Sequence, residues 1–143
     1  MEIVEKKHVG CYGVVYNNNN QVLLVRKAKG AYQGKLDLPG GGIEYGESVE
    51  ETLKREFLEE VGVVIREYSL RKVITNYVTW NLGDKYQERL QHIAIIHDVK
   101  LDENDFDKIK KEADGLDSLG AEWYDVSELS RDELSPLAMC VKD

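Results

Sequence analysis

The amino-acid sequence predicts an α/β fold in which a mixed sheet packs against helices. Several runs of β-branched and aromatic residues flank one long helical pattern, which lies within residues 41–63. The chain has 143 residues, of which 42% are hydrophobic and 32% are charged. This composition is typical of a folded domain with one sizeable core. We find no internal repeat or linker and expect a single domain over residues 1–143.

The first elements are expected to be strands. Residues 8–16 and 21–26 are rich in β-forming residues and are separated by four consecutive asparagines. Asparagine tolerates a left-handed backbone and forms local side-chain turns, so this pattern predicts a β-hairpin. Residues 36–39 predict a short extended segment, because Pro39 disfavours helix at the residue before it. The glycines at 40–42 then allow the backbone to turn tightly and approach a ligand.

The segment at residues 27–35 is predicted to be a polar loop with a local basic cluster. It carries Lys27, Lys29 and Lys35, and Arg26 precedes it. The simplest interpretation is a solvated loop, since most charge clusters face water. The alternative is a flexible rim whose cations contact phosphate groups of a ligand.

The central helix has a recognisable beginning and end. Ser48 is a candidate N-cap, and Glu51 completes a capping box three residues later. Gly62 is a typical helix stop. Later runs of β-forming residues predict further strands at 63–65, 69–80, 90–101 and 122–126, with a turn at 81–84.

The charged segment at residues 102–117 allows a short helix on the core. Phe106, Ile109 and Ala113 follow one another at i, i+3 and i+7, the spacing of one helical face. Ser127 and Ser135 are candidate N-caps of short helical pieces near the C-terminus.

The acidic residues of the central helix lie in an unusual place. At about 100° per residue, one apolar stripe should face the core: Val49, Leu53, Phe57 and Val61. Glu60 lies about 20° from Leu53 on the helical wheel, and Glu56 about 60° on the same side. Glu59 lies further round that side, at about 120°. The three carboxylates therefore start at the margin of the buried stripe and run outward from it.

Carboxylates in such a position repel one another and lose hydration. A divalent cation would relieve both effects. Clustered carboxylate oxygens suit Mg²⁺ or Mn²⁺, which keeps some waters and takes the rest of its shell from a phosphate. The helix therefore predicts a metal site at Glu56, Glu59 and Glu60.

Residues 41–63 resemble the Nudix box, G-x5-E-x7-R-E-U-x-E-E-x-G-U, where U is a bulky apolar residue. All seven fixed positions and two apolar positions are filled by matching residues: Gly41, Glu47, Arg55, Glu56, Glu59, Glu60 and Gly62, with Phe57 and Val63. At about one chance match in fifteen positions, all seven would coincide roughly once in 10⁸ starts. Outside the box, Leu38-Pro39-Gly40 and Glu122-Trp123 also resemble this family.

The resemblance implies a Nudix-type α/β/α sandwich with the box forming a loop, a helix and a loop. It also implies hydrolysis of a nucleoside diphosphate linked to another moiety, using Mg²⁺ or Mn²⁺. The metal ligands it implies are Glu56, Glu59, Glu60 and the carbonyl of Gly40. It gives Arg55 a supporting role, in which the guanidinium holds the Glu47 carboxylate by charge-assisted hydrogen bonds.

The identity of the general base is open at this point. Glu56 is the first candidate to accept the proton of the attacking water, directly or through the metal shell, and Glu59 is also a candidate catalytic residue. Some members of the family take their base from a later loop. Candidates for that role are Glu112, Asp114 and Asp117, for which a solvated loop charge is the simpler interpretation.

The substrate is less well specified than the reaction. The leading hypothesis is a nucleoside triphosphate, cleaved to a monophosphate and pyrophosphate. ADP-ribose, a dinucleotide or a nucleotide sugar is the alternative substrate class. A non-catalytic nucleotide-binding regulatory module is a third hypothesis, disfavoured because every carboxylate of the box is present.

Composition limits the other classes of partner. The net charge of −8 argues against nucleic-acid or anionic-membrane binding. No apolar run approaches the length of a membrane span, and the N-terminus has no signal-peptide pattern. Cys11 and Cys140 lie outside any CxxC pattern and predict two reduced cysteines, so we expect a cytoplasmic protein. A homodimer is common in families of this kind, but nothing in the composition requires one.

The remaining histidines and aromatic residues are expected to have structural roles. His92 and His97 are five residues apart, a spacing that suits no obvious pair of ligands. A second group comprises aromatic residues in or next to predicted strands: Tyr12, Tyr77, Trp80 and Tyr86. These could stack on a nucleobase, but strand aromatics more often lie in the core or in surface pairs.

Overall fold

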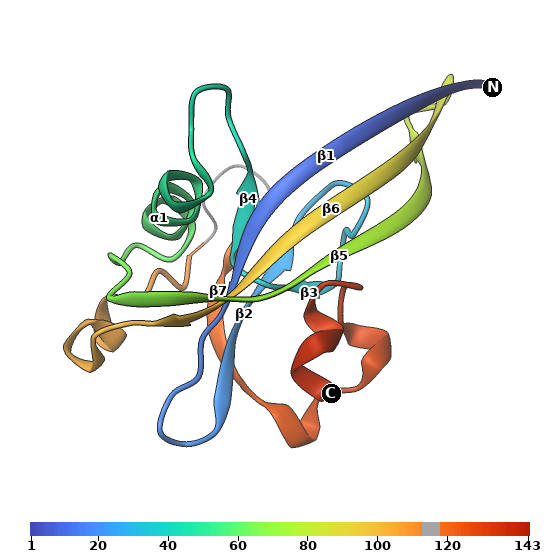
Figure 1. The fold of residues 1–143 in the computed structure, drawn as a ribbon. Helices are drawn as coiled ribbons and strands as arrows, with labels where there is room; N and C mark the ends of the chain where they lie inside the picture. Colours follow the sequence, from blue (N-terminus) through green and yellow to red (C-terminus); the bar gives the residue numbers. More distant parts are fainter. Residues whose placement is uncertain (113–117) are drawn as a thin grey trace.

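Two β-sheets form the centre of the molecule in the computed structural model, which describes residues 1–112 and 118–143 (Figure 1). The larger sheet has the strand order β4-β1-β6-β5, with β1 (Glu2–Val14), β4 (Gly40–Gly42), β5 (Glu67–Leu82) and β6 (Tyr86–Lys100). The smaller sheet has the order β3-β2-β7, with β2 (Gln21–Lys27), β3 (Leu36–Asp37) and β7 (Ser118–Asp125).

The larger sheet is mixed, as the sequence predicted. Strands β1 and β6 run parallel, with His8 opposite His92 and Tyr12 opposite Ile96. The other pairs are antiparallel, β4 with β1 and β5 with β6. The first residues of β1 are exposed, and there the three long strands extend together away from the helix (Figure 1).

The helix α1 (Val49–Glu60) forms between the predicted end residues. Ser48 and Glu51 make both bonds of the capping box, and Gly62 follows the helix with a φ of 85°. Leu53, Phe57 and Val61 are fully buried, whereas Val49 in the first turn is 37% exposed. The apolar stripe therefore begins at Leu53, one turn later than expected.

Short 3-10 helices supply the remaining helical structure. They are η1 (Glu103–Lys108), η2 (Val126–Glu128), η3 (Arg131–Glu133) and η4 (Ala138–Lys142). Among the described residues α1 is the one α-helix, and the C-terminal turns lie on the other side of the strands (Figure 1). The N-cap of η2 is Asp125 and not Ser127, whose N–H donates to it. The Ser135 hydroxyl accepts the N–H of Ala138, the first residue of η4.

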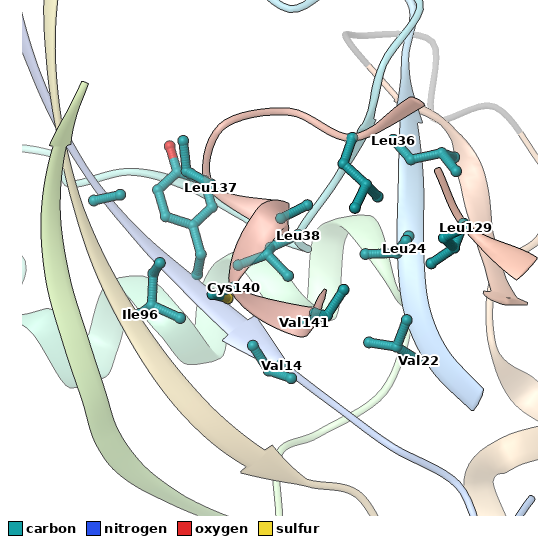
Figure 2. Close-up of a cluster of buried hydrophobic side chains, with 14 of the residues drawn as sticks. Val14, Val22, Leu24, Leu36, Leu38, Ile96, Leu129, Leu137, Cys140 and Val141 are labelled. Carbon is teal, nitrogen blue, oxygen red and sulfur yellow. The ribbon is translucent and has the colours of Figure 1, made fainter. Parts of the chain in front are cut away.

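Two apolar clusters hold these layers together. One lies under α1 and includes Leu53, Phe57 and Val61. The other lies between the two sheets and the C-terminal segment. Figure 2 shows Val22 and Leu24 of β2 on one side of it, Ile96 on the other, and Leu137 and Val141 between them.

Three predictions about secondary structure need correction. The expected hairpin is confined to the residues next to its turn, with a bridge between Tyr16 and Val22 and a bond from the Leu23 N–H to the Val15 carbonyl, because β2 continues into the smaller sheet beside β3 and β7. Residues 63–65 form an irregular connection and no strand, with Val63 and Ile65 buried and Val64 exposed. In the charged segment, a 3-10 helix ends at Lys108 and Ile109 is buried, while Ala113 lies outside the described residues.

In the described part of the chain, every helix is too short or too polar to cross a bilayer.

Candidate functional site

A cavity of about 720 Å³ lies where α1, the glycine strand β4 and the larger sheet meet. Residues from the loop at 27–35 close one side of it. Its lining changes in character from one region to another. Carboxylates of α1 line one wall, aromatic and histidine rings of the sheet line another, and lysines line part of the rim.

The acidic wall contains the three predicted glutamates. Glu60 is buried, with 4% exposure, and its Oε1 accepts the backbone N–H of Gly40 at 3.0 Å. The Glu56 side chain is 17% exposed and that of Glu59 is 54% exposed. Exposure thus rises from Glu60 through Glu56 to Glu59, the order that the helical wheel predicted. All three line the cavity.

The glycines of β4 allow the backbone to lie against these carboxylates. A Cβ at Gly41 would be 2.5 Å from the Glu56 carboxyl carbon and 2.6 Å from both its oxygens. Gly40 has a φ of 144°, and a Cβ there would be 2.1 Å from the carbonyl oxygen of Cys11. The three glycines form a strand paired with β1 and not the tight turn expected. Close approach of the backbone is what requires them.

Arg55 connects the glutamates to the segment before the helix. Its Nε donates to Glu47 Oε2 at 2.6 Å, and its Nη2 donates to Glu47 Oε1 and to the carbonyl of Gly42, each at 3.0 Å. Its Nη1 lies 2.8 Å from Glu56 Oε1 and 3.2 Å from Glu59 Oε2. The bonds from Arg55 lower the pKa of Glu47 to about 2 and raise the pKa of the guanidinium.

The donor chemistry of this wall suits a hard divalent cation. Within the described residues, however, no three acidic, histidine or cysteine side chains converge into a ready metal cage. One reason is that Arg55 bridges Glu56 and Glu59, and that Glu60 is bonded to Gly40. A bound cation would take part of its shell from water or phosphate, which suits Mg²⁺.

The aromatic wall centres on His92 of β6. Its Nε2 lies 2.8 Å from the Tyr12 hydroxyl and its Nδ1 lies 2.8 Å from the Tyr32 hydroxyl. The His8 ring lies 5.0 Å from the His92 ring, measured between centroids, and Leu90 also lines this region. Burial lowers the pKa of His92 to about 4, so the ring is neutral near pH 7.

Sequence patterns do not predict this wall. They favour structural roles for His92 and Tyr12 and indicate no role for His8 or Tyr32. The signal is the parallel register of β1 and β6, which places His8 opposite His92. That register becomes visible only once the strand pairing is known.

The basic loop is divided between two roles. Lys27 and Lys29 line the cavity, as the rim interpretation predicts. Arg26 donates to the carbonyl of Gly34, and Lys35 donates to the carbonyl of Asp132, so both bond to backbone away from the cavity. Lys110 also lines the cavity, and no motif or spacing in the sequence predicts this.

Other candidate residues do not line the cavity. Glu112 is exposed and lies outside it, and Asp114 and Asp117 lie outside the described residues. The remaining strand candidates are also absent from its lining: His97, Tyr77, Trp80 and Tyr86. The Trp80 indole N–H donates to Glu88, a buried carboxylate further along the strands.

The sequence was then compared with known proteins. A model of the NUDIX domain family matches residues 6–139. An 8-oxo-dGTP diphosphatase of Escherichia coli K12 is 42% identical over 59 residues, which is 41% of this chain and 46% of that protein. An ADP-ribose pyrophosphatase of Methanocaldococcus jannaschii is 36% identical over 62 residues, 43% of this chain and 37% of that protein. The matched stretch thus spans less than half the length of these relatives.

Two broader similarities cover most of the chain. The nucleoside triphosphatase NudI of Enterobacter sp. 638 is 28% identical over 125 residues, 86% of this chain and 82% of that protein. The crystal structure of a MutT NUDIX hydrolase from Burkholderia pseudomallei covers 95% of each chain with a TM-score of 0.61. At 18% identity, this structural likeness concerns the fold alone.

Proposed function

This chain belongs to the NUDIX domain family, and we propose that it hydrolyses a phosphoanhydride bond in a nucleotide. The proposed substrate is a nucleoside triphosphate, with a nucleoside monophosphate and pyrophosphate as products. One observation carries the proposal: a single cavity joins the carboxylates of α1 to a wall of aromatic rings. This arrangement suits a ligand with a phosphate chain at one end and a base at the other.

The acidic wall is the proposed reaction centre. Glu56, Glu59, Glu60 and the carbonyl of Gly40 would hold a divalent cation, Mg²⁺ or Mn²⁺. When bound, such an ion neutralises charge on phosphate oxygens and lowers the pKa of a coordinated water.

The chain's own residues supply orientation and proton transfer. Arg55, fixed by Glu47, holds the Glu56 carboxylate at 2.8 Å on the cavity wall. Glu56 is the proposed general base, because its carboxylate is partly accessible and lines the cavity. Lys27, Lys29 and Lys110 supply positive charge within the same cavity, which favours a polyphosphate over a neutral ligand.

The choice of a triphosphate over ADP-ribose rests on the extent of similarity. The nucleoside triphosphatase aligns along most of this chain, whereas the ADP-ribose pyrophosphatase aligns along less than half of it. A non-catalytic nucleotide-binding module stays the alternative from another class. The complete set of carboxylates and their arginine argues against it.

A substrate panel with product analysis tests the reaction. Purified protein is incubated with Mg²⁺ and each of a set of nucleoside triphosphates, including oxidised ones, and with ADP-ribose and dinucleotides. We expect a triphosphate to give the highest kcat/KM, with monophosphate and pyrophosphate as products. Preferred cleavage of ADP-ribose would show that the proposed substrate class is wrong. If no compound is cleaved, the result would favour a non-catalytic nucleotide-binding module.

A pair of variants tests the site. Glu59→Gln combined with Glu60→Gln removes two charges from the acidic wall, and hydrolysis is expected to fall at least about 100-fold. Glu50→Gln serves as the control, because this residue lies on the same helix and pairs with Lys54 in solvent. Undiminished hydrolysis in the double variant would show that the reaction centre is elsewhere.

A further inference from the structure

We propose that His92 is a positioning residue that holds the basic loop, residues 27–35, at the cavity through Tyr32. Through this contact, the neutral His92 ring sets how tightly the cavity holds the phosphate groups of its substrate. The inference rests on the proposed function only for its kinetic consequence. The contact between Tyr32 and His92 is made in the protein without any ligand.

The hydrogen bonds around His92 form one connected chain. Asn76 on β5 donates to the Tyr32 hydroxyl at 3.2 Å. That hydroxyl lies 2.8 Å from His92 Nδ1, and His92 Nε2 lies 2.8 Å from the Tyr12 hydroxyl. A neutral imidazole has one donor and one acceptor nitrogen, and both are used here. The chain links β5, the loop, β6 and β1.

The loop's backbone bonds shape the loop but do not attach it to the larger sheet. Lys27 N–H donates to the Lys35 carbonyl and Gly34 N–H donates to the Lys27 carbonyl, both at 2.9 Å. Gly30 and Gly34 have positive φ angles, with open space where a side chain would be. These bonds close a turn on itself, so its position relative to the larger sheet depends on side-chain contacts.

Tyr32 provides such a contact. It is 9% exposed in a segment that is otherwise largely open to solvent, and its ring stacks on His92 with centroids 5.6 Å apart and planes 21° apart. The neighbouring Ala31 packs on the same apolar cluster. A stacked ring with a bonded hydroxyl fixes both the depth and the orientation of the loop, which apolar packing alone does not.

The loop carries charge to the cavity. Lys27 and Lys29 precede Tyr32 by five and three residues, and all three residues line the same cavity as the carboxylates of α1. Displacing Tyr32 from His92 would therefore move the Lys29 ammonium group relative to the acidic wall, whereas Lys27 is the last residue of β2 and pairs with β7. The residues proposed to act on the scissile bond lie on α1 and β4, which the loop does not build. A shift of the loop is thus expected to change substrate affinity more than the rate of the chemical step.

Two variants separate the effect of the Tyr32–His92 hydrogen bond from the effect of the stacked His92 ring. Tyr32→Phe removes only the hydroxyl, and His92→Gln removes the ring while keeping a donor and an acceptor. Tyr77→Phe is the matched control, since Tyr77 lies on the same sheet, is 73% exposed and makes only a long bond to Gln91. Circular dichroism and thermal melting first establish that each variant is folded.

Hydrogen exchange of the loop amides is the first measurement and needs no substrate. In Tyr32→Phe and His92→Gln we expect amides of residues 30–35 to exchange about threefold to tenfold faster, because the first variant loses the hydrogen bond to His92 and the second loses the stacked ring. Tyr77→Phe should leave them unchanged. Unchanged exchange in both cavity variants would overturn the proposal, whatever their activity.

Steady-state kinetics with the nucleotide that the wild type hydrolyses is the second measurement. We expect KM to rise about threefold to tenfold in Tyr32→Phe, with kcat within about twofold of the wild type. A fall in kcat at unchanged KM would overturn the positioning role. If the wild type hydrolyses no nucleotide while loop exchange still rises in the variants, the proposed function fails and the loop contact stands.

Discussion

The Nε atom of Arg55 lies 2.6 Å from Oε2 of Glu47, and Nη2 of the same guanidinium lies 3.0 Å from Oε1. Two parallel bonds of this kind fix the plane of the guanidinium. The remaining nitrogen, Nη1, is thereby directed at Glu56 and Glu59. Glu47, near the start of the box, thus orients through Arg55 two carboxylates that follow it by nine and twelve residues in the sequence.

This relationship predicts that Glu47 is needed for full hydrolytic activity although it does not line the cavity. Glu47→Gln is expected to lower kcat about tenfold to 100-fold, as does loss of other groups that orient metal ligands. The measurement is kcat as a function of Mg²⁺ concentration. Glu128→Gln, an exposed change on η2, controls for the lost charge. Wild-type rates and wild-type Mg²⁺ dependence in Glu47→Gln would mean that Arg55 needs no partner.

Gly41 gives a steric prediction for the same wall. An alanine Cβ there would be 2.6 Å from both Glu56 carboxylate oxygens, so the Glu56 side chain must move. Gly41→Ala is expected to lower hydrolysis at least about tenfold, with a loss of unfolding free energy of about 1–3 kcal/mol.

Gly46→Asn is the control for Gly41→Ala. Gly46 has a φ of 88° and open space around it, and asparagine tolerates that backbone conformation. The rate of hydrolysis by Gly46→Asn should match that of the wild type. Equal activity in Gly41→Ala and Gly46→Asn would show that the position of Glu56 is unimportant. Activity and urea unfolding of both variants are the measurements.

The acidic wall could be predicted from the sequence because the relevant geometry is local. Glu56, Glu59 and Glu60 lie on one helix, whose period alone gives the order of their exposure. The capping box at Ser48 is equally local and was confirmed. The expected hairpin was wrong beyond its turn because strand pairing is not local. The strand β1 pairs with β4 and β6 in the larger sheet, whereas β2 pairs with β3 and β7 in the smaller sheet.

The aromatic wall could not be predicted for the same reason. Tyr12 and Tyr32 meet His92 across 80 and 60 residues of sequence. No periodicity within β1, the loop or β6 indicates that these side chains meet. An isolated histidine in a strand is most simply a satisfied structural residue, and His92 is satisfied, but by residues of the cavity.

Asp37 and Ser135 give a prediction about stability. The Ser135 hydroxyl donates to Asp37 Oδ1 at 2.6 Å, and the N–H of Leu38 donates to the same oxygen at 2.9 Å. Both Asp37 and Ser135 are buried, so loss of the hydroxyl leaves a buried carboxylate with fewer donors. Ser135→Ala is expected to lower the unfolding free energy by about 1–3 kcal/mol in urea.

Ser127→Ala is the matched control for Ser135→Ala. Its hydroxyl also donates to a carboxylate, Asp125, at 2.7 Å, but in solvent. It should change the unfolding free energy by less than about 0.5 kcal/mol. Equal losses in the two variants would show that burial of Asp37 has no special effect.

His92 gives a prediction about pH. Its pKa is lowered from 6.5 to about 4 in the folded protein, first by burial and then by the charges of His8 and Lys27. Between these two pH values the unfolded chain binds a proton at this residue and the folded chain does not. Stability therefore falls as the pH falls from about 6.5 to about 4, by up to about 3 kcal/mol from this residue alone.

His92→Gln removes this titratable ring and so separates its effect on stability from the effects of the other ionisable groups. Urea unfolding is measured at several pH values from 4 to 7.5 for both proteins. The wild type should lose more stability than the variant on acidification, because glutamine does not titrate. Glu47, whose pKa is lowered to about 2 mainly by its bonds to Arg55, contributes equally in both and cancels in the comparison. Parallel pH profiles for the two proteins would mean that the His92 ring can accept a proton without losing its bonds to Tyr12 and Tyr32.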